Sequence, residues 1–345
     1  MTEVNRLMIQ TEKFINDILK TIEREREREI ISRRFGLFER KETLEQIGEL
    51  LGITRERVRQ LEKAVLTRLK SSAEQGNLPH LTDIQQQIVD VLNQHGKASR
   101  ISELVTHLNL ENNKIEQAKL AFLAQLCTGL TVIDEDDDHY LSVVLASLGD
   151  IKDVKATVAK LVSGSKELGE PTTIDKIANK AAVADTAEAK ALSAISKHLA
   201  TLNGVWGLAK WPTINPKNIR DKIYVILKES GKHMHFNEIA DAIKQSSFRR
   251  KDVTTQAIHN ELIKDKRFVL VGRGIYALKE WGYEKGTVSD IIADILRKEG
   301  EALHRDEIVK RVLQSRYVKE TTILLNLQGK PKFKRVAKAT YALDE

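Results

Sequence analysis

The stretch Thr43–Lys70, TLEQIGELLGITRERVRQLEKAVLTRLK, predicts two helices joined by a tight turn. Thr43 can cap the first helix, and Gln46 three residues later completes a capping box. Gly52 stands where a helix commonly ends in the left-handed conformation, and Thr54 is a good N-cap for a second helix. Helix, turn and helix in this order is the plan of the helix-turn-helix motif.

The second helix has an apolar face and a polar face. Apolar residues at helical spacing predict a buried stripe, formed by Val58, Leu61, Val65 and Leu69. The opposite side and its flanks carry Arg55, Glu56, Arg59, Gln60 and Lys63. Such side chains read base edges and hold phosphates. An ordinary solvated helix face is the alternative, but the preceding capped helix and the glycine turn favour DNA binding.

The surrounding segment resembles a known family. The strings RRFGL, TLEQIGELLGITRERVRQLE and LTRLK match the fourth region of primary bacterial sigma factors in order and spacing, over roughly Thr21 to Ser72. In that family the module docks on the RNA polymerase flap and reads a promoter element. The resemblance implies that Arg57 contacts phosphate or a partner. It implies base-reading or phosphate roles for Arg55, Glu56, Arg59 and Gln60.

Composition indicates a globular chain of several domains. The 345 residues are 41% hydrophobic and 30% charged, and no apolar run approaches the roughly 20 residues that span a bilayer. No secretory signal begins the sequence. The single cysteine, Cys127, lies in an apolar helical context and cannot form an internal disulfide. We therefore expect a cytoplasmic, nucleoid-associated protein without membrane contact.

Basic charge gathers at the two ends of the chain. Residues 21–76 hold 13 Lys and Arg against 11 Asp and Glu, residues 77–216 hold 13 against 17, and residues 217–345 hold 27 against 18. A basic C-terminal part beside an acidic middle is typical of nucleic-acid binding. The predicted basic contacts there are Arg249, Arg250, Lys251, Arg273, Lys332, Lys334 and Arg335. A surface that only confers solubility is the alternative.

A repeat follows the first module, after a stretch at 71–81 that reads as a linker. The strings GKASRISELV, GKHMHFNEIA and GEALHRDEIV start at Gly96, Gly231 and Gly300, and a weaker copy, GEPTTIDKIA, starts at Gly169. Each copy ends in a β-rich stretch closed by an aromatic residue. The order helix, turn, helix, helix and hairpin predicts a winged helix, with Gly272 and Gly274 forming a hairpin turn.

The predicted fold is therefore mainly α, with a sigma region 4-like helix-turn-helix followed by tandem winged helices with small β-hairpin wings. The last two copies resemble the HARE-HTH family, found in the delta subunit of bacterial RNA polymerase, through HFNEIADAI, HRDEIVKRV, YALK and YALD. The predicted segments are an N-terminal helix (1–20), the sigma-like module (21–76), two winged-helix-like modules (82–145, 151–214) and two HARE-HTH-like modules (218–281, 287–345).

No residues assemble into a plausible catalytic, cofactor or metal site. His233 and His235 invite a metal interpretation, but His304 occupies the same repeat position as His235, which favours helix capping. The acidic run Asp134–Asp138 lies where the first wing should be, and we expect a solvated loop that repels phosphate. We find no phosphate-binding loop, and we predict a protein that is not an enzyme.

These patterns predict a DNA-binding transcription protein that acts on double-stranded DNA, with the RNA polymerase flap as a candidate partner. The chain has little room before Thr21 for the other regions of a full sigma factor, so we expect it not to initiate transcription alone. Alternatives are an architectural or protein-interaction scaffold, or an accessory of a restriction or defence system. Target sequence, sign of regulation, oligomeric state and the division of tasks among the modules stay open.

Overall fold

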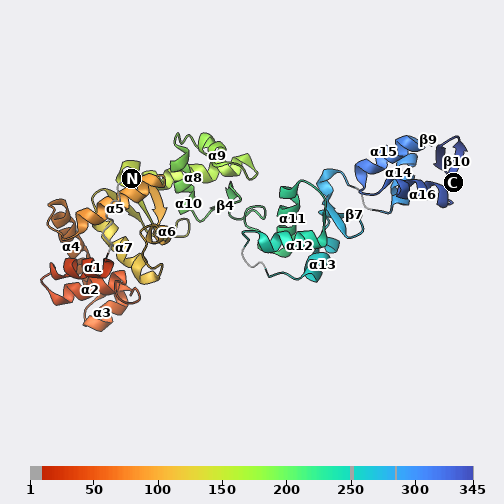
Figure 1. The fold of residues 1–345 in the computed structure, drawn as a ribbon. Helices are drawn as coiled ribbons and strands as arrows, with labels where there is room; N and C mark the ends of the chain where they lie inside the picture. Colours follow the sequence, from red (N-terminus) through yellow and green to blue (C-terminus); the bar gives the residue numbers. More distant parts are fainter. Residues whose placement is uncertain (1–9, 249–251, 284–285, 345) are drawn as a thin grey trace, which may run out of the picture. The chain divides into compact units, whose positions relative to one another are not determined.

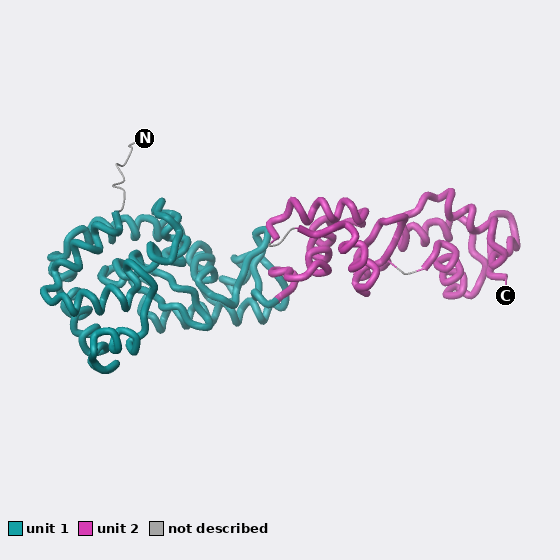
Figure 2. Tube along the Cα trace, turned by 90° about the horizontal axis from the view of Figure 1, so that it is seen from below, with its two compact units in different colours: residues 1–210 teal, residues 211–345 magenta. Residues whose placement is uncertain are grey.

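A computed structural model describes residues 10–248, 252–283 and 286–344. They form two compact units, unit 1 (Met1–Lys210) and unit 2 (Trp211–Glu345), coloured separately in Figure 2. Both units consist mainly of helices with small antiparallel sheets, as predicted. Within these described ranges, no helix combines the length and the apolar character that crossing a bilayer requires.

Unit 1 begins with four helices that contain the helix-turn-helix (Figure 1). They are α1 (Thr11–Lys20), α2 (Glu25–Phe35), α3 (Leu44–Leu51) and α4 (Arg55–Glu74). Ile30 of α2, Ile47 of α3 and Val58 of α4 are fully buried together and form a small core. This core fixes the angle between the two helices of the motif, because one side chain from each helix fills it.

The C-terminal half of α4 belongs to a second, larger core. Val65 and Leu69 pack there with residues of α1 and of the elements that follow. Leu78 and Leu81, which lie in the stretch predicted as a linker, are buried in this same core. The linker prediction is therefore wrong for this stretch, because its two leucines connect the helix-turn-helix to the next module through shared apolar burial.

Two copies of the repeat complete unit 1. Repeat 1 comprises α5 (Leu81–Gln94), β1 (Ala98–Arg100), α6 (Ile101–His107), α7 (Lys114–Leu126), β2 (Leu130–Ile133) and β3 (Ser142–Leu145), with β3 between the other two strands. A 3₁₀ turn, Ala146–Leu148, follows. Repeat 2 comprises α8 (Ile151–Leu168), α9 (Ile174–Lys180), α10 (Thr186–Ile195), β4 (Leu199–Leu202) and β5 (Val205–Leu208). In place of a first strand, repeat 2 has a single β-bridge, between Thr172 and Trp206.

Unit 2 contains the other two copies. Repeat 3 comprises α11 (Ile219–Ser230), β6 (Met234–His235), α12 (Phe236–Gln245), α13 (Thr255–Lys264), β7 (Phe268–Gly272) and β8 (Ile275–Leu278), followed by a 3₁₀ turn, Lys279–Trp281. Repeat 4 comprises α14 (Val288–Glu299), β9 (Leu303–His304), α15 (Arg305–Ser315), α16 (Glu320–Gly329), β10 (Phe333–Ala337) and β11 (Thr340–Leu343). In both sheets the last strand lies in the middle.

Repeats 3 and 4 match each other in detail. Each hairpin has its register shift at the same place, between Leu270 and Gly272 in one and between Arg335 and Ala337 in the other. Each also ties the start of its hairpin to its first helix by an ion pair. Arg267 donates to Asp221 at 3.0 Å, and Lys332 donates to Asp290 at 3.1 Å. Positions in these two repeats can therefore be compared directly.

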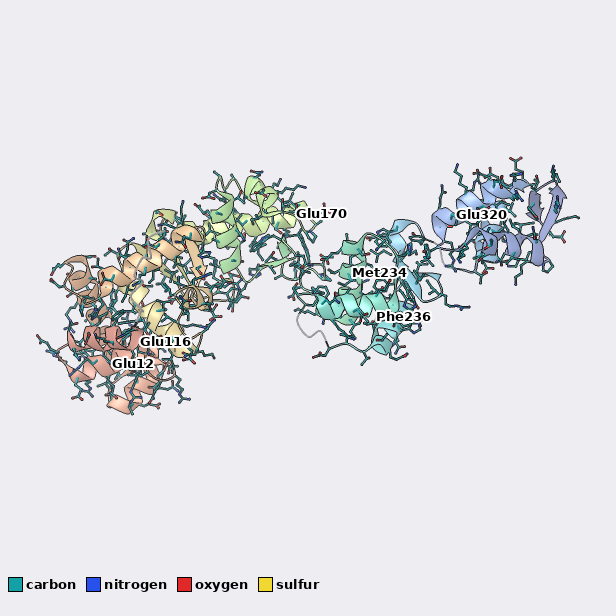
Figure 3. The ribbon with its side chains drawn as sticks, in the orientation of Figure 1. Glu12, Glu116, Glu170, Met234, Phe236 and Glu320 are labelled. Atoms are coloured by element: carbon teal, nitrogen blue, oxygen red, sulfur yellow. The ribbon has the colours of Figure 1, made fainter. Side chains whose placement is uncertain are left out.

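The histidines at the start of α12 and α15 are helix caps. His235 accepts a hydrogen bond from the backbone of Asn237, and Glu238 completes a capping box (Figure 3 labels the neighbouring Met234 and Phe236). His304 accepts from the backbone of Asp306 in the same way. The predicted capping role is confirmed, because each imidazole satisfies a backbone N–H that would otherwise lack a partner at the helix start.

Candidate nucleic-acid interface

The helix-turn-helix has the local structure that its sequence predicts. The Thr43 hydroxyl accepts from the backbone of Gln46 at 3.2 Å, and the Gln46 amide oxygen accepts from the backbone of Thr43 at 2.9 Å. Gly52 ends α3 in the left-handed region, with φ +62°. Thr54 then caps α4 by accepting from the backbone of Arg57. These three caps set where α3 stops and α4 starts.

A glycine inside α3 allows the two helices to approach closely. A Cβ atom at Gly48 would lie 2.7 Å from the carbonyl oxygen of Ile53, which is in the turn. A side chain there would therefore push the turn away from α3. Our sequence interpretation missed this residue, although a glycine at an interior helix position is a recognisable signal of close packing.

The six residues predicted to contact DNA on α4 are all exposed. They lie on the solvent side of the helix while Val58, Val65 and Leu69 are buried and Leu61 is half-buried. The exposed residues are Arg55, Glu56, Arg57, Arg59, Gln60 and Lys63. The predicted division of α4 into a buried stripe and a polar face is thus confirmed.

Acidic side chains hold the arginines of this face in place. Arg59 donates to both carboxylate oxygens of Glu56, at 2.8 and 2.6 Å. This pairing lowers the pKa of Glu56 from its ordinary value and raises that of Arg59. Arg55 pairs with Glu45 of α3 at 2.8 Å. Because these pairs are exposed, water and salt weaken them, and a phosphate can replace either carboxylate.

The polar face continues along α4 past the residues predicted from the sequence. Thr67 and Lys70 line a shallow groove together with Arg59, Lys63 and Leu66. Lys63, Thr67 and Lys70 are separated by four and three residues, so they follow one side of the helix. The sequence prediction stopped at Lys63, although the same spacing could have extended it to Lys70.

Helix α2 forms hydrogen bonds and ion pairs with both helices of the motif, α3 and α4. Arg26 donates to the carbonyl oxygen of Leu51 at the end of α3. The carboxylate of Glu27 is buried and accepts a hydrogen bond from Arg68 of α4. Arg34 forms an ion pair with Glu62 of α4 at 3.4 Å. The alternating Glu and Arg residues of α2 therefore connect three helices.

Four of the seven basic residues predicted in unit 2 lie on its hairpins or just before them. Arg249, Arg250 and Lys251 lie outside the described residues. Arg273 is exposed in the turn between β7 and β8. On β10 or just before it, Lys332 pairs with Asp290, Lys334 lies 3.9 Å from Asp344, and Arg335 is exposed.

The acidic run between β2 and β3 docks on repeat 2. Asp136 accepts hydrogen bonds from Lys155 at 2.7 Å and from His139 at 2.9 Å. These contacts hold the pKa of the Asp136 carboxyl well below its usual range, and Lys155 is the largest cause. Further ion pairs join Lys197 to Glu135 and His198 to Asp138.

The predicted loop at Asp134–Asp138 is present, and four of its five residues are exposed. Lys155 of α8 and Lys197, just before β4, pair with Asp136 and Glu135, so the run serves as a joint between repeats 1 and 2. Ligand atoms of Asp136, Asp138 and His139 lie within 4.8 Å of one another. The ion pair of Asp136 with Lys155 and the hydrogen bonds to His139 and His198 engage these ligand atoms.

Comparison with known proteins identifies one segment of the chain. The family described as Sigma-70, region 4 matches residues 24–71. The RNA polymerase sigma factor SigA of a Bacillus species is 44% identical over 57 residues, which are 16% of this chain and 15% of that protein. The RNA polymerase sigma factor sigB of Arabidopsis thaliana is 43% identical over 54 residues, 15% of this chain and 9% of that protein.

The matched segment coincides with α2, α3 and α4 up to Ser71. The likeness to sigma factors at this segment indicates a DNA-binding, transcription-related role, and the matched family is not an enzyme family. The chain covers less than a sixth of either relative's length.

Proposed function

We propose that this protein is a DNA-binding transcription protein that reads promoter-type DNA through α4. The observation that carries the proposal is the exposed face of α4, held by a doubly capped helix-turn-helix within the segment that matches Sigma-70, region 4. A helix presented in this way fits the major groove, with its N-terminal residues nearest the base edges.

The residues of α4 would divide the contacts between bases and backbone. Arg55 and Gln60 would bind guanine and adenine edges, and Glu56 would accept from cytosine. Arg57, Arg59 and Lys63 would hold phosphates. Because Arg55 and Arg59 are already paired with Glu45 and Glu56, binding would exchange these carboxylates for acceptors on the duplex.

The four repeats would serve as tandem winged helices, the last two of the HARE-HTH type. Their element order and their central last strand in three of the four sheets support this assignment. The boundaries would be those inferred from the sequence, with α1 and the stretch after α4 joined to the first modules by the shared core. Basic side chains on the hairpins of repeats 3 and 4 would bind adjacent phosphates.

We further propose that the protein works beside RNA polymerase, in the cytoplasm and on the nucleoid, as an accessory factor without enzymatic activity. The support is the similarity of residues 24–71 to a region of RNA polymerase sigma factors. By analogy with that family, α2 to α4 would dock on the polymerase flap, and the sign of regulation would depend on the promoter.

Base reading is tested by selecting bound sequences from a random duplex pool with the full chain. Changing Arg55→Ala together with Gln60→Ala should remove from the selected sequence the bases that α4 specifies, while leaving salt-sensitive binding to duplex DNA. The control removes one basic and one amide side chain from exposed positions of repeats 1 and 2, as Lys152→Ala with Gln86→Ala. A selected sequence that is unchanged by these two substitutions would overturn the reading role of α4.

The polymerase contact has a separate test. The tagged full chain should recover core RNA polymerase from purified components, and a chain carrying substitutions on the surface of α2 should recover less. No recovery from purified core enzyme would remove the accessory role and leave DNA binding unaffected.

A second candidate function is an architectural scaffold that binds proteins. The acidic run docked on repeat 2 favours it, since this wing is engaged within the chain. Under this alternative, the selection described above would yield no sequence preference even for the unmodified chain.

A further inference from the structure

The third helix of repeat 1 is covered by the rest of unit 1. Helix α7 packs against α1, α2 and α4. Lys119 of α7 is buried and pairs with Glu116 at 2.9 Å, and Glu12 of α1 lies 3.9 Å from its ammonium group (Figure 3 labels both carboxylates). Thr11 of α1 also donates to Glu116. This helix is therefore exposed only at its start, at Lys114 and Ile115.

The third helix of repeat 2 is covered in a different way. Helix α10 packs against β1 of repeat 1, so closely that a Cβ atom at Gly96 would lie 2.1 Å from the carbonyl oxygen of Ala187. Lys97 reaches across to Glu188 at 3.1 Å. The residues of α10 that are buried are Ala189, Ala191, Leu192, Ser193 and Ile195.

The third helix of repeat 3 is open. Helix α13 buries Ile258 and Leu262, while Gln256, Asn260 and Ile263 are exposed at helical spacing. The Gln256 amide donates to Asn260 at 3.2 Å, so the two amides lie on one side of the helix. Ile263 has 61% of its surface exposed, so its apolar side chain can be reached from solvent.

The third helix of repeat 4 has the same geometry with different chemistry. Ile323 and Leu327 of α16 are buried where α13 has Ile258 and Leu262. The exposed positions of α16 carry Thr321, Leu325 and Gln328 where α13 carries Gln256, Asn260 and Ile263. The neighbouring pair of amides is thus present on α13 and absent from these equivalent positions.

The hairpins of repeats 3 and 4 differ in exposure: one face of the repeat 3 hairpin is covered, and the same face of the repeat 4 hairpin is exposed. In repeat 3, Val269 and Val271 are buried because Trp281 and Tyr283 pack over them. The equivalent residues of repeat 4, Lys334 and Val336, are exposed. Lys338 extends the exposed basic side chains toward the hairpin turn. Repeat 4 therefore exposes basic side chains on its hairpin, whereas repeat 3 exposes the two amides and the isoleucine of its third helix.

We propose that unit 2 divides its contacts with DNA between its two repeats: α13 reads A·T pairs in the major groove, and the β10–β11 hairpin holds phosphates. This inference rests on the proposed function, that the chain binds duplex DNA. Gln256 and Asn260 can each bind the N6 and N7 edge of adenine, and Ile263 can contact the thymine methyl group. Lys334, Arg335 and Lys338 neutralise the backbone.

The dimensions of α13 fit this assignment. From Gln256 to Ile263 the helix rises about 10 Å, which matches about three base steps of roughly 3.4 Å each. A-form RNA is a poorer partner, because its deep and narrow major groove does not admit a helix. The ligand is therefore B-form DNA with two or three consecutive A·T pairs.

The test uses the full chain carrying Arg55→Ala and Gln60→Ala, so that α4 contributes no preference. Two duplexes of equal length, one of alternating A·T and one of alternating G·C, are titrated by fluorescence anisotropy. We expect roughly tenfold tighter binding to the A·T duplex, from one good amide–adenine pair. Adding Gln256→Ala and Asn260→Ala should remove most of this difference, and adding Ile263→Ala as well should remove the remainder. The matched control, Thr321→Ala with Gln328→Ala on α16, should leave it unchanged.

Modified bases test whether α13 enters the major groove and which base atoms it contacts there. Replacing adenine by 7-deazaadenine removes the N7 acceptor, and it should weaken binding unless Gln256 and Asn260 are already alanine. Replacing thymine by uracil removes the methyl group, and it should weaken binding of the chain with Ile263 and have no effect after Ile263→Ala. Insensitivity of the parent chain to 7-deazaadenine would overturn the reading role of α13.

The hairpin is tested by the salt dependence. Lys334→Ala with Lys338→Ala should weaken binding to both duplexes equally and make the slope of log K against log salt shallower by about 1.8, from about 0.9 per phosphate. An unchanged slope would overturn this half of the proposal. If the chain with its native α4 binds no duplex at all, the proposed function itself fails, which is distinguishable from a loss of A·T preference alone.

Discussion

Glu56 holds the guanidinium of Arg59 by two hydrogen bonds on the exposed face of α4. The carboxylate therefore has two effects on DNA binding, since it competes with phosphate for Arg59 and adds a negative charge to the face. Its pKa lies below its ordinary value because of Arg59, so the group stays ionised throughout the neutral range.

Glu56→Gln should strengthen binding to random duplexes several-fold. Arg59 then binds phosphate without first leaving Glu56, and the face loses a negative charge, so the affinity should rise. Anisotropy titrations at low salt measure this change. Glu170→Gln, an equal change of charge at an exposed site of repeat 2, should leave the affinity as it is. An unaltered affinity for Glu56→Gln would show that Glu56 does not compete with DNA for Arg59.

Thr43→Ala should loosen α3 without affecting the repeats. Losing the capping box costs roughly 0.5–2 kcal/mol of local stability, which corresponds to about 2-fold to about 30-fold faster amide exchange in α3. Hydrogen exchange followed by mass spectrometry measures this change on peptides of α3. Thr43→Ser keeps the hydroxyl acceptor and should retain native exchange rates. Equal acceleration in both variants would argue against capping as the cause.

Gly96→Ala should separate repeat 2 from repeat 1. The new methyl group would overlap the carbonyl of Ala187, and overpacking of this kind costs about 1–3 kcal/mol. Gly169→Ala is the matched control, because Gly169 has a similar φ of +76° but no atom within 4 Å of the added Cβ. Thermal unfolding of the full chain should show a larger loss for Gly96→Ala. Equal losses of thermal stability in the two variants would mean that the positive φ at each glycine, and not the contact with Ala187, causes the destabilisation.

The joint at Asp136 should weaken in acid. Its pKa is lowered on folding from an ordinary value of 3.8. The pairing with Lys155 therefore stabilises unit 1 fully above about pH 4, and this stabilisation is lost as the pH falls through the lowered folded pKa. Asp136→Asn should lower the melting temperature at pH 7, and the difference from the native chain should shrink steadily as the pH falls below about 4. Asp137→Asn, at an exposed neighbouring position, should change little at either pH.

Local features of the helix-turn-helix were predictable because each depends on a few neighbouring residues. Thr43 with Gln46, the stop at Gly52 and the cap at Thr54 all appear as predicted. The capping role of His235 was predictable from its recurrence in the repeat. In each case a short-range rule of backbone hydrogen bonding determines the outcome.

Contacts between distant segments could not be predicted in this way. Gly96 touches Ala187, and Asp138 pairs with His198, but no periodicity in the sequence connects residues so far apart. The acidic run was therefore interpreted through its charge alone, as a solvated loop. Only the packing of repeat 2 reveals the basic partners that neutralise it.

In unit 1 the segment that sequence similarity identifies differs from the segment that shares one hydrophobic core. The segment that similarity identifies, residues 24–71, ends within α4, whereas Val65 and Leu69 of that helix are buried among residues of α1 and repeat 1. Excised at its homology boundaries, the segment would leave these side chains in water. We therefore expect the segment recognised by similarity not to fold stably on its own. Grafting it into another protein would require carrying α1 and repeat 1 with it.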